Sequence, residues 1–423
     1  MWMKNMKENP NQHSMQWFQR AQKVLPRGIY GHQGPTDGCL SPPENFPLFT
    51  SRAEGSYFWD VDNNRYIDYM CAYGPNILGY GDQDVDMAAQ QQLAIANCTT
   101  APHTLMVDLA ETLVDTIASA DWAFFAKNGT DVTTLALLTA KAYTGKEKVI
   151  AIKGGYHGVA PCFQADGTPG ITTVDNEHIL RVDWNNISQI KKQIKNNPDN
   201  IAAFIATPYH HPVFARSEMP SEHYWHTVRK LCNDNGIVLI IDDVRCGFRM
   251  NMEGSDSYFG FKADLICYCK ALANGWSIAA LCGNEKLKSA CGSVRFTGSY
   301  WLSAAPMAAC LATLEKLKKL DAPKLMRTMG EKLLFNLEEV AEYYGFKLDV
   351  SGHPSLFSLQ LKNASGFRLH QAWIGECVKR GVYFTMHHNH FINCSLTDAD
   401  IEETLKICGQ AFEAVKKEHS ALL

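Results

Sequence analysis

Short apolar runs alternate with helical segments from about residue 84 onward, and this alternation constrains the fold more than any other feature of the chain. The runs that read as buried strands are 122–125, 148–152, 202–206, 237–241, 265–267 and 278–282, and helices are expected near 105–119, 130–144 and 221–235. Strands that are apolar on both faces and separated by helices are typical of a mostly parallel sheet covered on both sides. The sequence therefore predicts an α/β fold.

The two flanking regions have a different pattern. Residues 15–24 read as a short helix, and 46–70 read as an antiparallel meander with its turn at 60–64. After about residue 304, a long helical stretch leads to two helices, near 366–379 and 397–416, and several short strands. We expect three regions: 1–75, a helix and meander that pack with the small domain; 76–305, the large α/β domain; and 306–423, a small α+β domain.

Composition excludes several classes of protein. With a net charge of −4, the chain lacks the excess of positive charge that is typical of nucleic-acid-binding proteins. No apolar run approaches the roughly 18 residues of a membrane span. The first ten residues are polar and lack the apolar core of a signal peptide. The 14 cysteines are scattered, as expected of buried residues in a reducing cytosol rather than of a disulfide or metal framework. We expect a cytoplasmic protein without nucleic-acid or membrane partners.

An amine and a carboxylate stand at the carboxyl ends of two predicted strands. Lys270 follows the run 263–269, and Asp242 follows the run 238–241. A lysine desolvated there has a lowered pKa, as a Schiff-base nucleophile requires. A carboxylate such as Asp242 can keep a pyridine nitrogen protonated, although Asp242 alone also fits a cap or a solvated turn. The pair predicts pyridoxal phosphate as cofactor, bound to Lys270 and paired with Asp242.

Two glycine-containing turns support this prediction. The turn Asn128-Gly129-Thr130 opens a helix, where free backbone N–H groups and the helix dipole favour a phosphate. The turn 154–158 follows a strand and offers the flat faces of Tyr156 and His157 to a pyridine ring. Taken singly, each also fits an ordinary turn. In the same region, Asp243 and Arg249 are expected to be structural, as an ion pair or as loop-holding contacts.

In combination these motifs resemble the class III aminotransferase family of fold type I pyridoxal phosphate enzymes, and most closely its glutamate-1-semialdehyde 2,1-aminomutase subgroup. The resemblance covers nearly the whole chain, including the stretches 53–62, 73–75, 143–148 and 156–158. It implies a large cofactor-binding domain with a mostly parallel seven-stranded sheet, plus a small α+β domain. It also implies a homodimer with the active site at the interface.

The resemblance implies a role for each matching residue. Lys270 would be the Schiff-base lysine, Asp242 the partner of the ring nitrogen, and Tyr156, beside His157, the residue stacked on the ring. The phosphate would be held by Gly129, Thr130 and the amide of Asn128, with Thr297 or Ser299 reaching it from the neighbouring subunit.

Departures from the aminomutase pattern concern the substrate. The arginine that binds the substrate carboxylate is absent from Ile29–Gly34, Thr207-Pro208 replaces a Glu-Pro pair, and Tyr73 replaces a tryptophan. An acidic residue of the aminomutase site falls in the histidine-rich segment 387–390. The residues expected to contact substrate are Tyr30, His32, Tyr73, Thr207 and His388. No metal is expected, because the family needs none.

The predicted function is therefore a pyridoxal phosphate aminotransferase that acts on a small-molecule amino donor and a carbonyl acceptor. The missing arginine favours an acceptor without a carboxylate at that position, such as an aldehyde or ketone on a sugar, polyol or similar biosynthetic intermediate. The alternatives are an aminomutase that retains its intermediate, an epimerase or decarboxylase on the same scaffold, and a relative that binds without catalysis.

Overall fold

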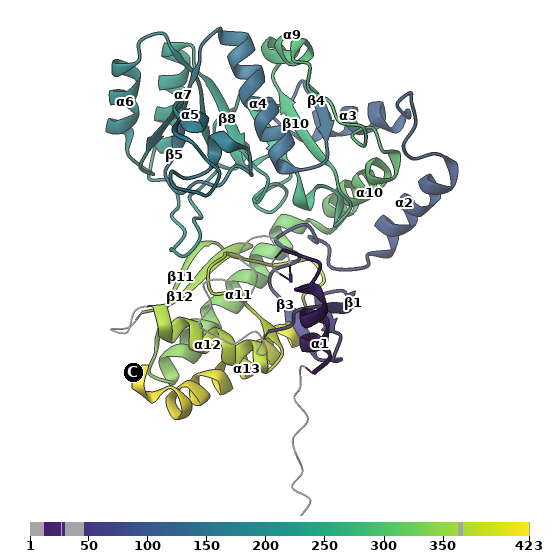
Figure 1. Cartoon of the computed structure of the whole chain (residues 1–423), viewed down its shortest axis with the longest axis vertical. Helices are drawn as coiled ribbons and strands as arrows, with labels where there is room; N and C mark the ends of the chain where they lie inside the picture. The colour runs from purple at the N-terminus through teal and green to yellow at the C-terminus, as the bar shows by residue number, and fades with distance from the viewer. Residues whose placement is uncertain (1–11, 27, 30–45, 363–366, 423) are drawn as a thin grey trace, which may run out of the picture.

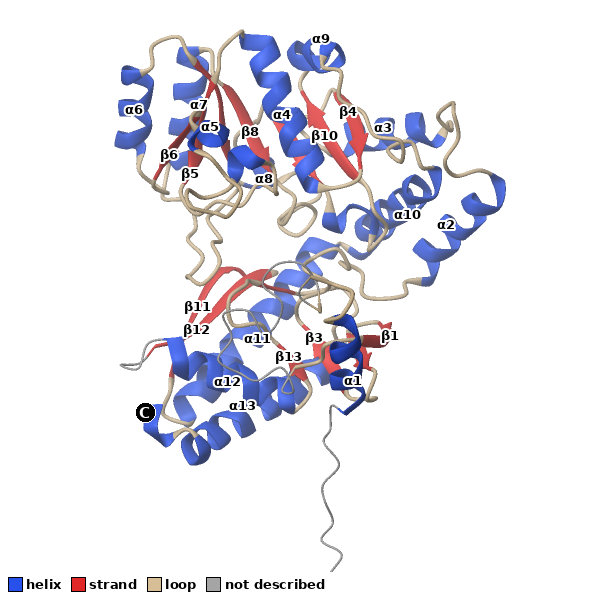
Figure 2. Cartoon of the chain, in the orientation of Figure 1, coloured by secondary structure: helices blue, strands red, loops and turns tan. Residues whose placement is uncertain are grey.

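The computed structural model describes residues 12–26, 28–29, 46–362 and 367–422. Its largest sheet lies in the upper half of the molecule in Figure 2 and has the strand order β4-β10-β9-β8-β7-β5-β6. The strands are β4 (Trp122–Ala126), β5 (Lys148–Ile152), β6 (Ile179–Val182), β7 (Ile201–Ala206), β8 (Val238–Asp242), β9 (Leu265–Tyr268) and β10 (Ala279–Gly283). The strand β10 runs antiparallel to both of its neighbours, β4 and β9, and all other neighbouring pairs in this sheet are parallel. The predicted α/β fold with a mostly parallel sheet is confirmed.

The central strands are apolar throughout because both faces of the sheet are covered. Successive residues of β8 point to opposite faces: Ile240 packs in one core, and Leu239 and Ile241 pack in the other. The helix α4 (Gly129–Thr144) contributes Val132 to the first core, and α7 (Tyr224–Asn235) contributes Val228 to the second. The strand β6 was not among the predicted runs, because this four-residue edge strand is only partly buried and follows a polar segment.

The lower half of the molecule in Figure 1 contains two smaller sheets. In one, β1 (Thr50–Glu54), β2 (Tyr57–Asp60) and β3 (Arg65–Asp68) form the predicted antiparallel meander, and β13 (Val382–Tyr383) adds to β3 in parallel. The other contains β11 (Lys347–His353), β12 (Leu356–Lys362) and β14 (His390–Phe391). One strand of the C-terminal region thus belongs to the same sheet as the meander.

The remaining helices surround these sheets. They are α1 (Gln12–Ala21), α2 (Gln83–Ile95), α3 (Leu105–Thr116), α5 (Thr173–Asn176), α6 (Ile187–Asn196), α8 (Ser255–Tyr258), α9 (Glu285–Ser293), α10 (Ala304–Leu320), α11 (Ala322–Tyr343), α12 (Phe367–Lys379) and α13 (Asp398–Glu418). The helices α10 and α11 lead from the upper half to the lower half (Figure 1). Among the described residues, no helix is long and apolar enough to cross a membrane. The boundaries after residues 75 and 305 stay a prediction.

Candidate active site

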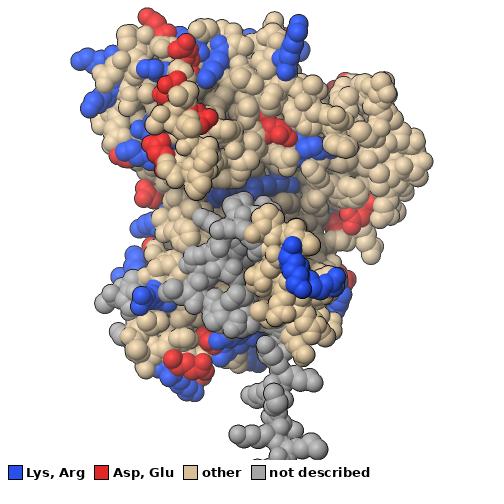
Figure 3. Space-filling view, viewed as in Figure 1, with Lys and Arg blue, Asp and Glu red and all other residues tan. Residues whose placement is uncertain are grey.

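The predicted site residues follow the carboxyl ends of neighbouring strands. Asp242, the last residue of β8, pairs with Cys267 of β9, and Lys270 follows two residues after the end of β9. Because parallel strands end at the same edge of a sheet, Asp242 and Lys270 lie at one edge, and the carboxyl end of β8 points toward the lower half of the molecule (Figure 2). Figure 3 shows the surface hollowed between the two halves, with Lys or Arg atoms inside the hollow.

Lys270 is half-buried and adopts a left-handed backbone conformation, with φ of +38°. Its Nζ donates a hydrogen bond of 2.7 Å to the backbone carbonyl of Tyr73. Burial, and next the positive charge of Arg245, lower the pKa of the Lys270 amine from 10.5 to about 8. A lowered pKa increases the fraction of neutral amine, which is the nucleophilic form.

Asp242 is buried and held in place by His157. His157 Nδ1 lies 2.7 Å from Asp242 Oδ2, and the backbone N–H of Val244 donates to Asp242 Oδ1 at 3.2 Å. The His157 ring is 2% exposed and packs edge-on against Phe163. His157 is therefore placed to orient the carboxylate and would act on a pyridine ring through Asp242.

The first turn of α4 lies against two neighbouring loops. Gly158 has φ of +100°, and a Cβ there would lie 2.9 Å from Thr130 Cα and closer still to its hydroxyl. The hydroxyl of Thr130 accepts a hydrogen bond of 3.1 Å from the backbone N–H of Val159. Gly129 makes the other close approach, because a Cβ there would lie 3.1 Å from Val244 Cγ1. The two glycines thus bring the turns predicted to hold the cofactor into direct contact.

A capping interaction fixes the start of α4. The backbone N–H groups of Lys127 and Asn128 donate to Asp131 Oδ2, at 3.1 and 2.8 Å. The Asn128 amide, predicted to hold phosphate, therefore already has an acceptor. A helix N-terminus nevertheless favours an anion through its dipole and its first-turn N–H groups, so Gly129 and Thr130 carry more of the predicted phosphate contact.

Arg245 is a site residue that the sequence analysis did not identify. It is 8% exposed, and its guanidinium lies over the ring of Tyr156, with Cζ 5.6 Å from the ring centroid. Arg245 Nη1 donates to Asn389 Oδ1 at 2.9 Å and lies 3.2 Å from His211 Nδ1. Its one sequence signal is a charged residue in the loop directly after the strand-end carboxylates.

Asp243 and Arg249 hold loops, as predicted, but do so separately. Asp243 accepts hydrogen bonds from the backbone N–H and the hydroxyl of Ser255, and burial raises the pKa of Asp243 to about 7. Arg249 is fully buried and donates to the carbonyls of Gly74 and Ile392. Arg249 therefore ties the loop after β3 to the loop after β14.

The predicted substrate residues are only partly brought together. The Tyr73 ring packs edge-on against His388, with centroids 5.4 Å apart, and the backbone carbonyl of Tyr73 accepts the hydrogen bond from the Lys270 amine. Thr207 is buried, and its hydroxyl donates to the carbonyl of Tyr209 at 2.7 Å. Thr297 and Ser299 are exposed. Tyr30 and His32 lie outside the described residues.

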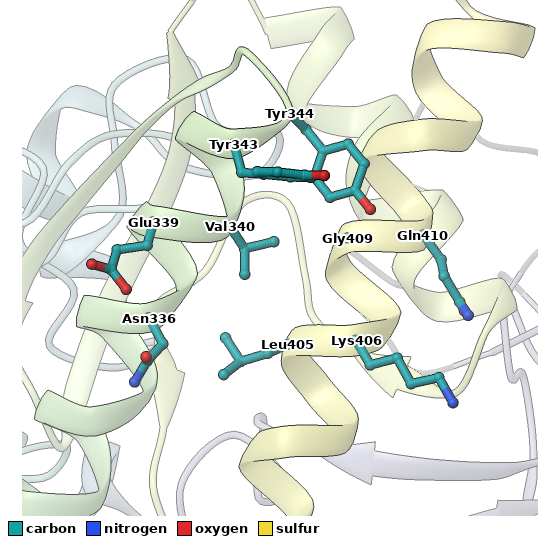
Figure 4. Close-up of a pocket in the computed structure, with 9 residues that line it drawn as sticks. All are labelled: Asn336, Glu339, Val340, Tyr343, Tyr344, Leu405, Lys406, Gly409 and Gln410. Atoms are coloured by element: carbon teal, nitrogen blue, oxygen red, sulfur yellow. The ribbon is translucent and has the colours of Figure 1, made fainter.

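The residues present fit pyridoxal phosphate. The chemistry of the donor set matches the cofactor group by group: a desolvated amine at Lys270, a buried carboxylate at Asp242, an aromatic face at Tyr156, and a helix N-terminus at Gly129 and Thr130. A pocket with a volume of about 580 Å³ lies elsewhere, between α11 and α13 (Figure 4). It is lined by Asn336, Glu339, Val340, Tyr343, Tyr344, Leu405, Lys406, Gly409 and Gln410, none of them a predicted site residue.

Comparison with known proteins supports this fit. The family model for class III aminotransferases matches residues 40–412. The chain is 38% identical over 404 residues to aminopentol aminotransferase of Sphingopyxis macrogoltabida, an alignment that covers 96% of this chain and 94% of the relative. It is 28% identical to glutamate-1-semialdehyde 2,1-aminomutase of Francisella philomiragia, over 95% of this chain and 98% of the relative.

The solved structures agree. The internal aldimine form of the FumI protein of Sphingopyxis sp. MTA144, with PLP, superposes with a TM-score of 0.93 at 37% identity, covering 97% of this chain and 98% of that one. An omega-transaminase of Sphaerobacter thermophilus shares the fold, with a TM-score of 0.87 at 22% identity, over 98% of this chain and 100% of that one. The chain therefore belongs to the class III aminotransferase family and is a pyridoxal phosphate-dependent aminotransferase.

Proposed function

We propose that this aminotransferase acts on a hydroxyl-rich amine and its carbonyl counterpart, with no carboxylate at the reacting carbon. The observation that carries the proposal is the pair formed by Tyr73 and His388 beside the Lys270 amine. Burial, and next the charge of Arg245, hold the pKa of His388 well below its usual range, so the imidazole is neutral at physiological pH. Neutral imidazole can both donate and accept hydrogen bonds, which suits hydroxyl groups.

The relatives support this choice. The aminopentol aminotransferase, whose name describes an amine with five hydroxyl groups, is 38% identical to this chain. The carboxylate-binding arginine of the aminomutases is absent from the segment 29–34. Both observations favour a polyol-like amine over an α-amino acid as the substrate that sets this enzyme apart from the aminomutases.

The residues of this chain divide the work of the reaction. Pyridoxal phosphate supplies an aldehyde that takes up the amino group and a ring that accepts carbanion charge. Lys270 would bind the cofactor, be displaced by the donor amine, and then move a proton between the donor carbon and the cofactor as general base and acid. Asp242, oriented by His157, would hold the proton on the ring nitrogen. Gly129 and Thr130 would hold the phosphate, and Tyr156 would cover the ring.

The proposed assembly is a homodimer in which Thr297 or Ser299 of each chain completes the phosphate site of the other. Both residues are exposed in the single chain, next to Tyr300, which is 70% exposed. An exposed aromatic side chain beside polar groups is a common composition for a subunit interface. The proposed location in the cell remains the cytoplasm.

The direct experiment follows one half of the reaction. Purified protein loaded with pyridoxal phosphate is mixed with aminopolyols, simple amines and amino acids, and conversion to the pyridoxamine form is followed by visible absorbance. We expect the fastest conversion with an aminopolyol. The Lys270→Ala variant should convert the amine about 10²- to 10⁴-fold more slowly, which is the rate contribution typical of a general base.

Lys316→Ala is the matched control, because Lys316 pairs with Asp82, the N-cap residue of α2, and with Asp84 in its first turn, and no contact with the site residues is seen among the described residues. It should convert the same substrates at the wild-type rate. Turnover of a single substrate without any external amino donor would show an aminomutase instead. Protein that stays colourless after cofactor addition, or that converts only amino acids, would contradict the proposal.

A further inference from the structure

Arg245 is a buried cation that makes no close ion pair, and its charge interacts with the Asp242 carboxylate only at longer range. Among the residues that the structure describes, no carboxylate lies within ion-pair distance of its guanidinium, although the residue is 8% exposed. Its acceptors are neutral: the side-chain oxygen of Asn389, and the carbonyl and ring nitrogen of His211. Burial holds the pKa of His211 well below its usual range, so this neighbour carries no charge either. A buried charge without a close ion pair is costly, and a bound anion would offset that cost.

The hydrogen bonds of Arg245 leave most of its guanidinium donors available. All three contacts come from one terminal nitrogen, Nη1. The other guanidinium nitrogens, Nε and Nη2, have no hydrogen-bond partner in the described part of the chain. Neither of these two nitrogens is fully enclosed by the protein. Arg249 differs, because its Nε is fully enclosed and its terminal nitrogens bind backbone carbonyls.

The position of Arg245 places these donors in the active site. Its guanidinium lies over the Tyr156 ring, and its charge acts on the amine of Lys270 and the imidazole of His388. Asn389 anchors Arg245 and follows His388 directly in the chain. The free edge of the guanidinium is therefore close to the groups proposed to handle the substrate.

We infer that Arg245 binds the carboxylate of the second substrate, the amino acid or 2-oxo acid that exchanges the amino group with the polyol-like amine. The inference rests on the proposed function, which requires two different substrates. The planar fork of arginine matches a carboxylate through two parallel hydrogen bonds. Arg245 would thereby take the place of the arginine missing from the segment 29–34, from a different element of the fold.

Two substitutions test the inference. Arg245→Met removes the charge. Asn389→Asp keeps Arg245 and the local shape but places a carboxylate 2.9 Å from Nη1, where the amide oxygen now lies. This internal carboxylate should occupy the guanidinium and compete with the substrate, while keeping the fold intact if Arg245→Met fails to fold. His178→Gln, at a partly exposed histidine outside the site, serves as control.

Both half-reactions are measured with protein loaded with cofactor. With a 2-oxo acid such as pyruvate, each variant should lose affinity by about 10- to 150-fold, the range for a hydrogen bond to a charged group. With the aminopolyol, or with a carboxylate-free amine if no aminopolyol reacts, each variant should lose clearly less than it loses with pyruvate, because that substrate offers no charge to Arg245 and is affected only through the influence of Arg245 on the Lys270 amine. Calorimetry with propionate gives a readout without turnover: it should bind the wild type and not the variants.

Other outcomes separate the possible failures. Wild-type protein that reacts with carboxylate-free amines but not with aminopolyols removes the proposed function while leaving the role of Arg245 testable. Equal losses in both half-reactions, or unchanged pyruvate and propionate affinity, would overturn the inference.

Discussion

At the scale of single residues, His157 is the clearest case of a side chain that acts through another. It is buried and bonds Asp242 at 2.7 Å. Replacing it with phenylalanine leaves the Asp242 carboxylate without this partner, which costs about 1.5–3 kcal/mol. We predict about 10- to 150-fold weaker binding of pyridoxal phosphate, measured by titrating cofactor-free protein. His353→Phe is the control, because this buried histidine bonds Ser355 instead. Equal cofactor affinity in the two variants would contradict the assignment.

A second prediction concerns pH. The Lys270 amine has a pKa lowered from 10.5 to about 8, chiefly by burial and next by Arg245. The amine therefore loses its proton at a lower pH than a solvated lysine, and capture of the cofactor aldehyde by cofactor-free protein should speed up through pH 8 and level off above it. Arg245→Gln should move this midpoint upward, because one of the charges that disfavours the ammonium is gone.

Stopped-flow absorbance across the pH range measures the midpoint. Arg216→Gln is the control: Arg216 is exposed and lies near Asp349, and it should leave the midpoint in place. A midpoint near 10.5 in the wild type would show that Lys270 is solvated in the cofactor-free protein.

At the scale of elements, the contact between the loop after β5 and the start of α4 depends on Gly158. Alanine there meets two obstacles, the positive φ of +100° and the collision with Thr130. Gly167 isolates the first, since its φ is +82° and a Cβ there meets nothing within 4 Å. We predict that Gly167→Ala costs about 1 kcal/mol of unfolding free energy in urea, and Gly158→Ala about 1–3 kcal/mol more, with weaker cofactor binding. Similar losses in both variants would show that the contact with Thr130 is unimportant.

The element scale also shows what sequence can and cannot predict. Lys270 and Asp242 were found because each follows an apolar strand, and strand ends of a parallel sheet converge. The strand β6 was missed because an edge position needs little apolar surface, so its four residues carry a weak pattern. The partnership of Arg245 with Asn389 joins positions 144 apart. Its geometry depends on the directions of two loops, and no local periodicity encodes those directions.

At the scale of the whole molecule, the proposed dimer can be tested by coexpressing two chains that carry different inactivating substitutions. Chains with Lys270→Ala are coexpressed with chains carrying Thr297→Ala and Ser299→Ala. If each site borrows its phosphate contact from the partner, a hybrid dimer has one intact site. Random pairing then makes half the dimers hybrids, so about a quarter of wild-type activity should return.

The control pair is Lys270→Ala with Asp242→Asn. In the proposed dimer both residues would serve the site of their own chain, so every hybrid site would be defective and no activity should return. Activity that stays at the level of the parents in the first mixture would show that Thr297 and Ser299 act within their own chain or not at all.

The pairing of β13 with β3 has a consequence for how the protein is made. The ribosome releases the meander well before it releases the parallel partner strand and Asn393, which bonds Ser56 across 337 positions. The strands of the large sheet are complete once Gly283 has emerged. Domains tend to fold as they are synthesised, so the Lys270 side of the site can assemble on the nascent chain. The side of the site formed by Tyr73 and His388 can assemble only after β13 and the residues that follow it have been synthesised. Until then β3 is an unpaired edge strand of the meander, which could pair with neighbouring chains.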